Sequence, residues 1–313
     1  MSTGRSFGRL LLGLVAWCLA GAVAPAEEAR PTLAPDASPP AGEPAVWAVR
    51  DHDSTLYLFG TIHLRRPGAP WGGPTARRAL DEAGTVWLEV SPDDLSPEKA
   101  GRLLQAIGFD PARPLRQRLD PERLRQVRET ARSLGVPWPA IETMKPWLLS
   151  SVLALGPMNR AGYTPESGVD RMVAEAATGA GKAIRALETG EQQLRYLDGL
   201  PESEQLAMLY EALDLQADSV GMLQTAEAAW ETGDEAGLRA LLIEPMAQNY
   251  PDLHEAIIDR RNHRWAETLA EVMAGSGVDF VAIGAGHLGG ERSVDALLAA
   301  RGYRVERLTP APP

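Results

Sequence analysis

Leu56-Tyr-Leu-Phe-Gly-Thr-Ile-His63 and Phe280-Val-Ala-Ile-Gly-Ala-Gly-His287 are two similar stretches near opposite ends of a chain of 313 residues. Each begins with a short apolar run that predicts a buried strand, and each ends on a Gly-x-x-His tetrapeptide followed by leucine. A histidine one short turn beyond a strand lies at the rim of a sheet, where open α/β folds place their sites. Because the chain has only five histidines, this arrangement predicts that His63 and His287 act together on one metal ion or one reacting atom.

The strands implied by the sequence cluster at both ends of the chain, and helices fill its middle. Residues 46–50 and 55–59 alternate around a polar turn and predict a β-hairpin. Residues 85–90 predict a strand that is buried on both faces. Further strands are expected at 182–187, 278–283 and 303–308, and helices at 74–83, 121–134, 169–177, 201–230, 251–274 and 293–300. The sequence therefore predicts an α/β fold with a mixed central sheet, built from strands of both chain ends, and a helical insertion in the middle.

Residues 1–26 are typical of a secretory signal peptide. Two arginines precede an apolar run at residues 10–24, and Ala24-Pro-Ala26 offers a cleavage site. The run is shorter than the ~20 apolar residues that span a bilayer. We therefore expect a periplasmic or secreted protein that begins near Glu27 and has no stable membrane anchor after cleavage. Its mature chain would contain no cysteine, because the one cysteine is Cys18.

Beyond the signal segment, composition predicts a proline-rich linker at 27–45, one domain at 46–308 and a short tail at 309–313. The full chain has 31 basic and 42 acidic residues, so its formal net charge is −11. An acidic surface repels phosphate backbones, which disfavours nucleic acid as a partner. We expect the partner to be a peptide or a small-molecule substrate.

Glu89 is the first candidate partner for the two histidines, because it lies in an otherwise apolar strand. A buried carboxylate is costly unless it is paired or bound to a metal. The alternative is that Glu89 lies at the mouth of the strand and is solvated. Two histidines and one carboxylate are a ligand set that leaves open positions on a catalytic divalent metal. His63, His287 and Glu89 are therefore the predicted metal ligands.

Three further groups of residues have both a functional and an ordinary interpretation. Arg261-Asn262 interrupts the apolar face of the helix predicted at 251–274, either to stabilise an oxyanion or simply to be solvated. Asp170 and Glu188 either orient the histidines by hydrogen-bonding to their rings or cap helices. Residues 284–289 also fit the G-x-G-x-x-G dinucleotide pattern. That alternative is disfavoured, because no second nucleotide-binding half follows and a signal segment directs the chain away from nicotinamide cofactors.

Seven motifs together resemble the bacterial TraB/GumN family, and the resemblance runs from about residue 46 to residue 308. This family is related to the Tiki metalloproteases and the PrgY pheromone-shutdown proteins, and more remotely to erythromycin esterase and haem-binding ChaN-like proteins. The motifs are, in order, Gly60-Thr-Ile-His63 after a hairpin, Trp87-Leu-Glu-Val90, Lys145-Pro-Trp147, Gly168-Val-Asp170, Leu187-Glu-Thr-Gly-Glu-Gln192, Arg261-Asn262 with Trp265, and Gly284-Ala-Gly-His287.

The resemblance implies a peptidase-like site that depends on a divalent metal of the manganese or cobalt type, with zinc a further option. By position, its residues are His63, His287, Glu89 and Arg261. The chain departs from its relatives at Gly286, where they often carry a larger apolar residue. We interpret the protein as a metal-dependent hydrolase of peptide bonds in which Glu89 is the third ligand or the general base. The alternatives are a metal-independent esterase with His63 as general base, and a non-catalytic protein that binds a peptide or haem.

Overall fold

The computed structural model describes residues 42–309. The predicted signal segment, most of the predicted linker and the last four residues lie outside this range. Between residues 42 and 309, no helix combines the length and the apolar character that crossing a bilayer requires.

Six strands form one mixed sheet in the order β4-β3-β5-β2-β1-β6. Their bounds are β1 (Val46–Arg50), β2 (Ser54–Thr61), β3 (Thr85–Leu88), β4 (Ala183–Ala186), β5 (Gly277–Gly284) and β6 (Arg304–Arg307). Strands β4, β3, β5 and β2 run parallel to one another, whereas β1 is antiparallel to both β2 and β6. Both chain ends contribute strands, which confirms the predicted mixed sheet.

Helices fill the segments between the strands, and most of them lie in the sequence between β3 and β4 or between β4 and β5. The α-helices are α2 (Pro74–Glu82), α3 (Pro97–Ile107), α4 (Leu115–Arg118), α5 (Pro121–Ser133), α6 (Trp138–Ile141), α7 (Pro146–Arg160), α8 (Val169–Gly179), α9 (Gly190–Asp198), α10 (Glu202–Asp214), α11 (Ser219–Glu231), α12 (Glu235–Leu238), α13 (Glu244–Asn249), α14 (Pro251–His254), α15 (Arg260–Met273) and α16 (Val294–Ala300). Two π-helical segments, η2 (Arg239–Ile243) and η3 (Glu255–Asp259), and two 3-10 turns, η1 (Pro165–Ser167) and η4 (Ala285–His287), complete the chain.

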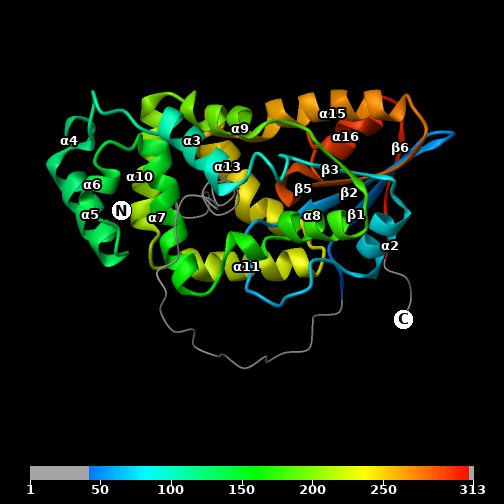
Figure 1. The fold of residues 1–313 in the computed structure, drawn as a ribbon, viewed down its shortest axis with the longest axis horizontal. Coiled ribbons are helices and arrows are strands. Elements are labelled where there is room, and N and C mark those ends of the chain that lie inside the picture. Colours follow the sequence, from blue (N-terminus) through cyan, green and yellow to red (C-terminus); the bar gives the residue numbers. More distant parts are fainter. Residues whose placement is uncertain (1–41, 310–313) are drawn as a thin grey trace, which may run out of the picture.

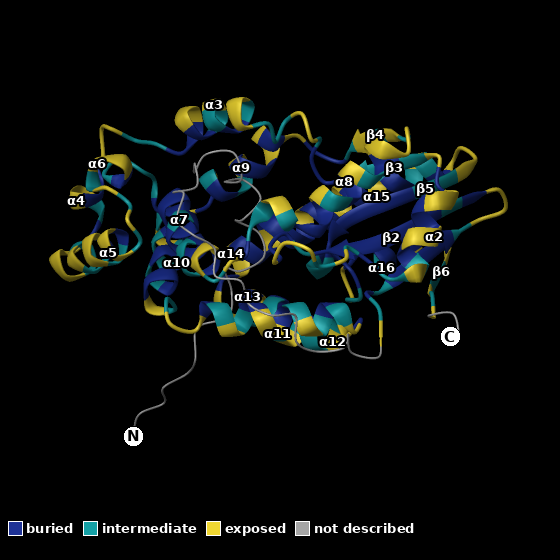
Figure 2. Ribbon diagram, turned by 60° about the horizontal axis from the view of Figure 1, so that its bottom comes forward, coloured by how far each residue is buried: buried dark blue, intermediate teal, exposed yellow. Residues whose placement is uncertain are grey.

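Helices cover both faces of the sheet (Figure 1). On one face, α2, α8 and α11 pack on a layer that includes Phe59, Val86 and Phe280. On the other face, α15 and α16 pack on a layer that includes Leu58 and Ile283. Buried residues fill the central strands, and exposed residues line the outer sides of the helices (Figure 2). The sheet is therefore the middle layer of three, and only its edges remain open for a site.

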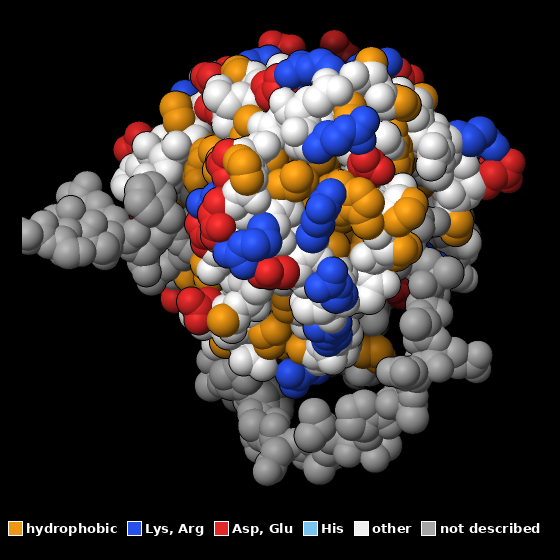
Figure 3. Space-filling view, turned by 90° about the vertical axis from the view of Figure 1, so that its left-hand side faces the viewer, with side chains coloured by type: hydrophobic (Ala, Val, Ile, Leu, Met, Phe, Trp, Pro, Cys, Tyr) orange, Lys and Arg blue, Asp and Glu red, His pale blue; other side chains and the backbone are white. Residues whose placement is uncertain are grey.

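A further core lies among the helices at the other end of the molecule, where α7 packs along α10. Trp147 and Leu153 of α7 are fully buried there. Figure 3 shows the end of this helical part, where Lys and Arg side chains lie among acidic and hydrophobic ones. Arg113, for example, lies 2.8 Å from a carboxylate oxygen of Glu202. These surface charges are largely paired with their neighbours and mark no separate site.

Local signals in the sequence account for several element boundaries. Asp120 caps α5 by accepting a hydrogen bond from the backbone of Arg123 at 2.9 Å, and Thr189 forms a capping box with Gln192. The prediction for β3 was partly wrong, because this strand ends at Leu88 and alternates between buried and half-buried residues. The helix expected at 251–274 is also not regular, since the π-helical segment η3 widens it just before the site.

Candidate active site

Four neighbouring parallel strands end at one edge of the sheet, and a candidate residue follows each of them. Glu188 follows β4, Glu89 follows β3, His287 follows β5 and His63 follows β2. The backbone N–H of Glu188 donates to the carbonyl of Glu89 at 2.9 Å, so these two strand ends stay together. The carboxyl ends of parallel strands are where open α/β folds gather binding groups. Side chains that are distant in sequence therefore lie side by side.

Gly284, the last residue of β5, lies at the point around which three of these side chains gather. A Cβ at this position would lie 3.2 Å from Glu89 Oε1, 3.5 Å from His287 Cδ2 and 3.6 Å from His63 Nε2. The backbone N–H of Gly284 itself donates to Glu89 Oε1 at 2.6 Å. A side chain larger than a methyl group would enter the space between the three residues, so the site requires glycine here for room.

Arg261, in the first turn of α15, lies fully buried at the centre of this cluster. Its Nε and Nη2 groups donate to Glu188 at 3.0 and 2.7 Å, and Nη2 also donates to Glu89. Nη1 donates to the carbonyl of Ile257 at 3.0 Å and to His287 Nε2 at 3.2 Å. A guanidinium has five N–H donors, and these contacts use all of them. The solvated alternative for Arg261 is therefore wrong, and no donor is left for a substrate oxyanion.

His63 is oriented by Asp170, which lies at the start of α8. Asp170 Oδ1 is 3.1 Å from His63 Nδ1, and both side chains are buried. The helix approaches closely because Gly168 precedes it, where a Cβ would lie only 2.6 Å from the carbonyl oxygen of His63. Burial alone would lower the pKa of His63, but the carboxylates of Asp170 and Glu89 outweigh burial and raise it. His63 Nδ1 thus donates to Asp170, and Nε2 lies toward Gly284.

His287 is held as a neutral imidazole. Its Nδ1 donates to Asn262 Oδ1 at 2.6 Å, and its Nε2 accepts from Arg261. The ring packs against Trp265, with 4.5 Å between the ring centroids. Burial first, and then the charge of Arg261, lower the pKa of His287 to about 3. Asn262 therefore fixes the tautomer of His287 as Asp170 does for His63.

Acid should destabilise the metal-free protein through His287. The unfolded chain binds a proton there near the ordinary pKa of 6.5, whereas the folded chain binds it only near 3. This contribution to stability is fully present above pH 6.5 and falls by up to about 1.4 kcal/mol for each pH unit below it. Urea unfolding across this pH range, with a chelator present, measures the loss. His287→Gln should lose less unfolding free energy in acid than wild type, and the exposed control His52→Gln should lose as much as wild type. Equal losses in all three proteins would contradict the assignment of the acid sensitivity to His287.

The cluster forms the floor of a mainly apolar cavity of about 840 Å³, a volume that includes the solvent at its mouth. The walls are aliphatic side chains from α11, α12, η2 and α13, namely Leu223, Leu238, Leu242, Ile243 and Met246. An adjoining polar cavity is lined by His254, Asp259 and Arg292, and Arg239 lines both. The glycine at position 286 makes room for this wall, because a Cβ there would lie 2.7 Å from Ile243 Cδ1.

The charge of the cluster suits a divalent metal. The carboxyl groups of Glu89, Glu188 and Asp170 face one guanidinium, so buried acidic groups outnumber the permanent cation of the cluster. Buried charge is costly unless it is compensated. Among the predicted ligands, His63 Nε2 and Glu89 Oε1 approach the same point and are suitable donors. The third, His287, does not fit as it is placed, because its Nε2 accepts a hydrogen bond from the guanidinium.

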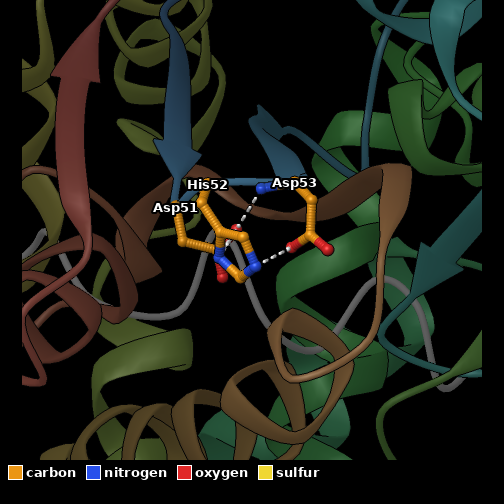
Figure 4. Close-up of side chains that lie close together, drawn as sticks. All are labelled: Asp51, His52 and Asp53. Atoms are coloured by element: carbon orange, nitrogen blue, oxygen red, sulfur yellow. Dashed lines mark hydrogen bonds and ion pairs between the residues drawn. The ribbon is translucent and has the colours of Figure 1, made fainter.

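Three other potential metal ligands, Asp51, His52 and Asp53, lie in the turn between β1 and β2 (Figure 4). Their ligand atoms lie within 4.8 Å of one another, and no other group of three or more meets this criterion between residues 42 and 309. All three residues are exposed. The turn precedes β2 whereas His63 follows that strand, so the group lies at the opposite edge of the sheet from the buried cluster.

The structure gathers the predicted site residues at one edge of the sheet, but the ligand atoms of His63, Glu89 and His287 do not all lie within 4.8 Å of one another. Some of the settings assigned to these residues also change. Glu89 is 3% exposed, so its solvated alternative is wrong, and His63 and His287 are buried rather than open at the rim. Glu188 holds Arg261 instead of a histidine. Gln193 was not predicted as part of the site, but its Nε2 lies 3.3 Å from both Glu89 and Glu188. The capping box that opens α9 was the available signal, because it fixes the first turn of α9 next to Glu188.

Comparison with known proteins places this site in a family. The sequence profile described as the TraB/PrgY/gumN family matches residues 45–307. Uncharacterized protein YbaP of Escherichia coli strain K12 is 26% identical over 255 residues, which is 82% of this chain and 92% of that protein. YbaP of Shigella flexneri is 26% identical over 77% of this chain and 87% of its own length.

A third relative carries a functional description. The "Metalloprotease TIKI homolog" of Amphimedon queenslandica is 30% identical over 174 residues, and the match covers 46% of this chain and 34% of that protein. No solved structure matches the chain. The family profile spans every strand of the sheet and every residue of the buried cluster. This chain therefore belongs to the TraB/PrgY/gumN family.

Proposed function

We propose that this protein is a metal-dependent hydrolase that cleaves peptide bonds at the buried cluster of His63, Glu89, Arg261 and His287. The observation that carries the proposal is the excess of buried carboxyl groups over guanidinium groups beside two suitable metal donors, at the floor of an apolar cavity. The description of the sponge relative as a metalloprotease homolog supports the same class of reaction. The substrate is a peptide or a small acyl compound that enters the cavity.

His63 and Glu89 would hold the ion, which when bound lowers the pKa of a water molecule and polarises the scissile carbonyl. Asp170 keeps Nε2 of His63 directed into the cluster by accepting a hydrogen bond from Nδ1. Arg261 positions Glu89 and His287 and takes no direct part in binding substrate, because its donors are all used. Hydrolysis adds the hydroxyl of water to the acyl carbon and its proton to the amine, as the C–N bond breaks.

A metal-independent hydrolase is the second candidate, and the contact between Arg261 and His287 Nε2 favours it. In this reaction, His63 Nε2 takes a proton from water as the hydroxyl attacks the carbonyl carbon, and later gives that proton to the leaving group. Asp170 stabilises the imidazolium. Since the pKa of His63 is raised above 6.5, the neutral base forms as the pH rises through that higher value. Activity would accordingly increase on the alkaline side.

Metal removal separates the two candidates. The purified protein is dialysed against EDTA and incubated with a mixed peptide library, alone and with Mn²⁺, Co²⁺ or Zn²⁺. We expect cleavage only when a metal is restored. Cleavage that persists in EDTA and increases with pH above 6.5 would favour His63 as a metal-free base. A protein that cleaves no peptide under any of these conditions would contradict both hydrolase proposals and leave a peptide-binding or haem-binding protein.

We place the hydrolase in the periplasm or outside the cell, on the basis of the signal-like residues 1–26. Mass spectrometry of the exported protein should find an N-terminus near Glu27. An exported chain that retains Met1 would contradict this location.

A further inference from the structure

Two arginines line the apolar cavity between residues 42 and 309, and Arg239 is the one whose guanidinium is not paired with a carboxylate. It begins the π-helical segment η2 and lines both the apolar cavity and the adjoining polar one. Between residues 42 and 309, its guanidinium makes no hydrogen bond or ion pair. Arg261, the other arginine of the cavity, has every donor engaged within the cluster. An arginine in this state that lines an apolar cavity is suited to bind an anionic ligand.

The loop after β5 holds Arg239 in place without consuming its hydrogen bonds. The guanidinium lies against the backbone of Gly290, where a Cβ would lie only 2.0 Å from Nη1. Glu244, Asp259 and Glu291 also line the polar cavity, but none of them forms an ion pair with Arg239 between residues 42 and 309. The charge of Arg239 also acts on Asp295, whose carboxylate accepts from the backbone N–H of Gly289 at 3.0 Å. Arg292, which lines the polar cavity, is already paired with Asp259 at 2.8 Å. Arg239 is thus positioned by packing and keeps its planar set of donors available.

The surroundings of Arg239 indicate which anion it binds. The walls next to it are aliphatic, with Leu223, Leu242 and Met246 among them. One guanidinium beside such walls matches a single carboxylate attached to a small apolar group, because the two N–H donors of its edge bind a carboxylate in a bidentate manner. A C-terminal residue with an aliphatic side chain has both features, with the scissile bond next to them.

We propose that Arg239 binds the free carboxylate of the substrate, so that the protein acts on peptides or N-acyl amino acids with an aliphatic C-terminal residue. The substrate preference rests on the proposed function, whereas binding of a carboxylate by Arg239 can be measured without turnover. The aliphatic side chain occupies the apolar cavity above the cluster. Arg239 therefore selects the last peptide bond of a chain over internal bonds.

Binding of N-acetyl-leucine and of N-acetyl-leucinamide to the metal-free protein tests the proposal. These ligands differ in the carboxylate alone, and isothermal titration calorimetry measures each dissociation constant. We expect the acid to bind at least about tenfold more tightly than the amide, since hydrogen bonds to charged groups are the strong ones. Arg239→Gln should remove this preference, Arg239→Lys should keep part of it, and the matched control Arg292→Gln should keep all of it.

Three outcomes would overturn the proposal: no binding of the acid at millimolar concentration, equal binding of acid and amide, or a preference that survives in Arg239→Gln. Circular dichroism of each variant checks that its fold is retained. A separate outcome, the absence of peptide cleavage with every metal, would contradict the proposed hydrolase function but not the binding of a carboxylate by Arg239. A preference for the acid in a protein without turnover would leave Arg239 as a carboxylate-binding residue of a non-catalytic site.

Discussion

Replacing Arg261 with methionine is expected to lower the free energy of unfolding by about 3–5 kcal/mol, the range measured when one partner of a buried ion pair is removed. Methionine fills similar space but leaves the carboxylates of Glu89 and Glu188 buried without their cation. Both carboxylates are less than 5% exposed. The effect should lie near the upper end of the range, because one substitution leaves two charges uncompensated. Urea unfolding of the metal-free protein measures the change.

The neighbouring residue on the same helix provides the control. Arg260 is exposed and lies 3.6 Å from Glu255, so Arg260→Met should change stability by less than about 1 kcal/mol. A triple variant, Arg261→Met with Glu89→Gln and Glu188→Gln, removes the stranded charges and should recover part of the loss. Equal stability of Arg261→Met and Arg260→Met would show that Arg261 does not hold the cluster together.

The strand ends of this fold could be predicted because they depend on local patterns. Short apolar runs followed by glycine indicated β2 and β5, and the similarity of their endings indicated that His63 and His287 lie at one edge. The parallel order β3-β5-β2 then places Glu89 beside His287, with His63 on the other side of His287. Asp120 and Thr189 likewise marked helix starts through the chemistry of their own side chains.

The partners inside the cluster could not be predicted, because they depend on how helices from distant sequence pack over the strand ends. Nothing in the sequence near Arg261 indicates that all five of its donors are used. The π-helical turn η3 ends at Asp259, two residues before Arg261, and hydrophobic periodicity alone predicts a regular helix there. The role of Arg239 could not be predicted for the same reason, because its position depends on a contact with Gly290, which is distant in sequence.

Replacing His63 with glutamine is expected to reduce peptide hydrolysis by about 10²–10⁴-fold, the usual contribution of a positioned base, whether His63 holds a metal or accepts the proton itself. Glutamine retains an N–H donor for Asp170, whose Oδ1 lies 3.1 Å from His63 Nδ1. The buried carboxylate therefore keeps a partner, and the midpoint of urea unfolding should change little. His52→Gln, in the exposed turn between β1 and β2, removes the same side chain outside the cluster and should leave the rate unchanged.

The central claim is that the buried cluster is a hydrolytic centre, and one measurement tests it most directly. The initial rate of cleavage of a single peptide from the library is determined by mass spectrometry for wild type, His63→Gln and His52→Gln under the same metal conditions. We predict that the rate falls at least about 10²-fold in His63→Gln alone. Equal rates for wild type and a folded His63→Gln variant would contradict the claim.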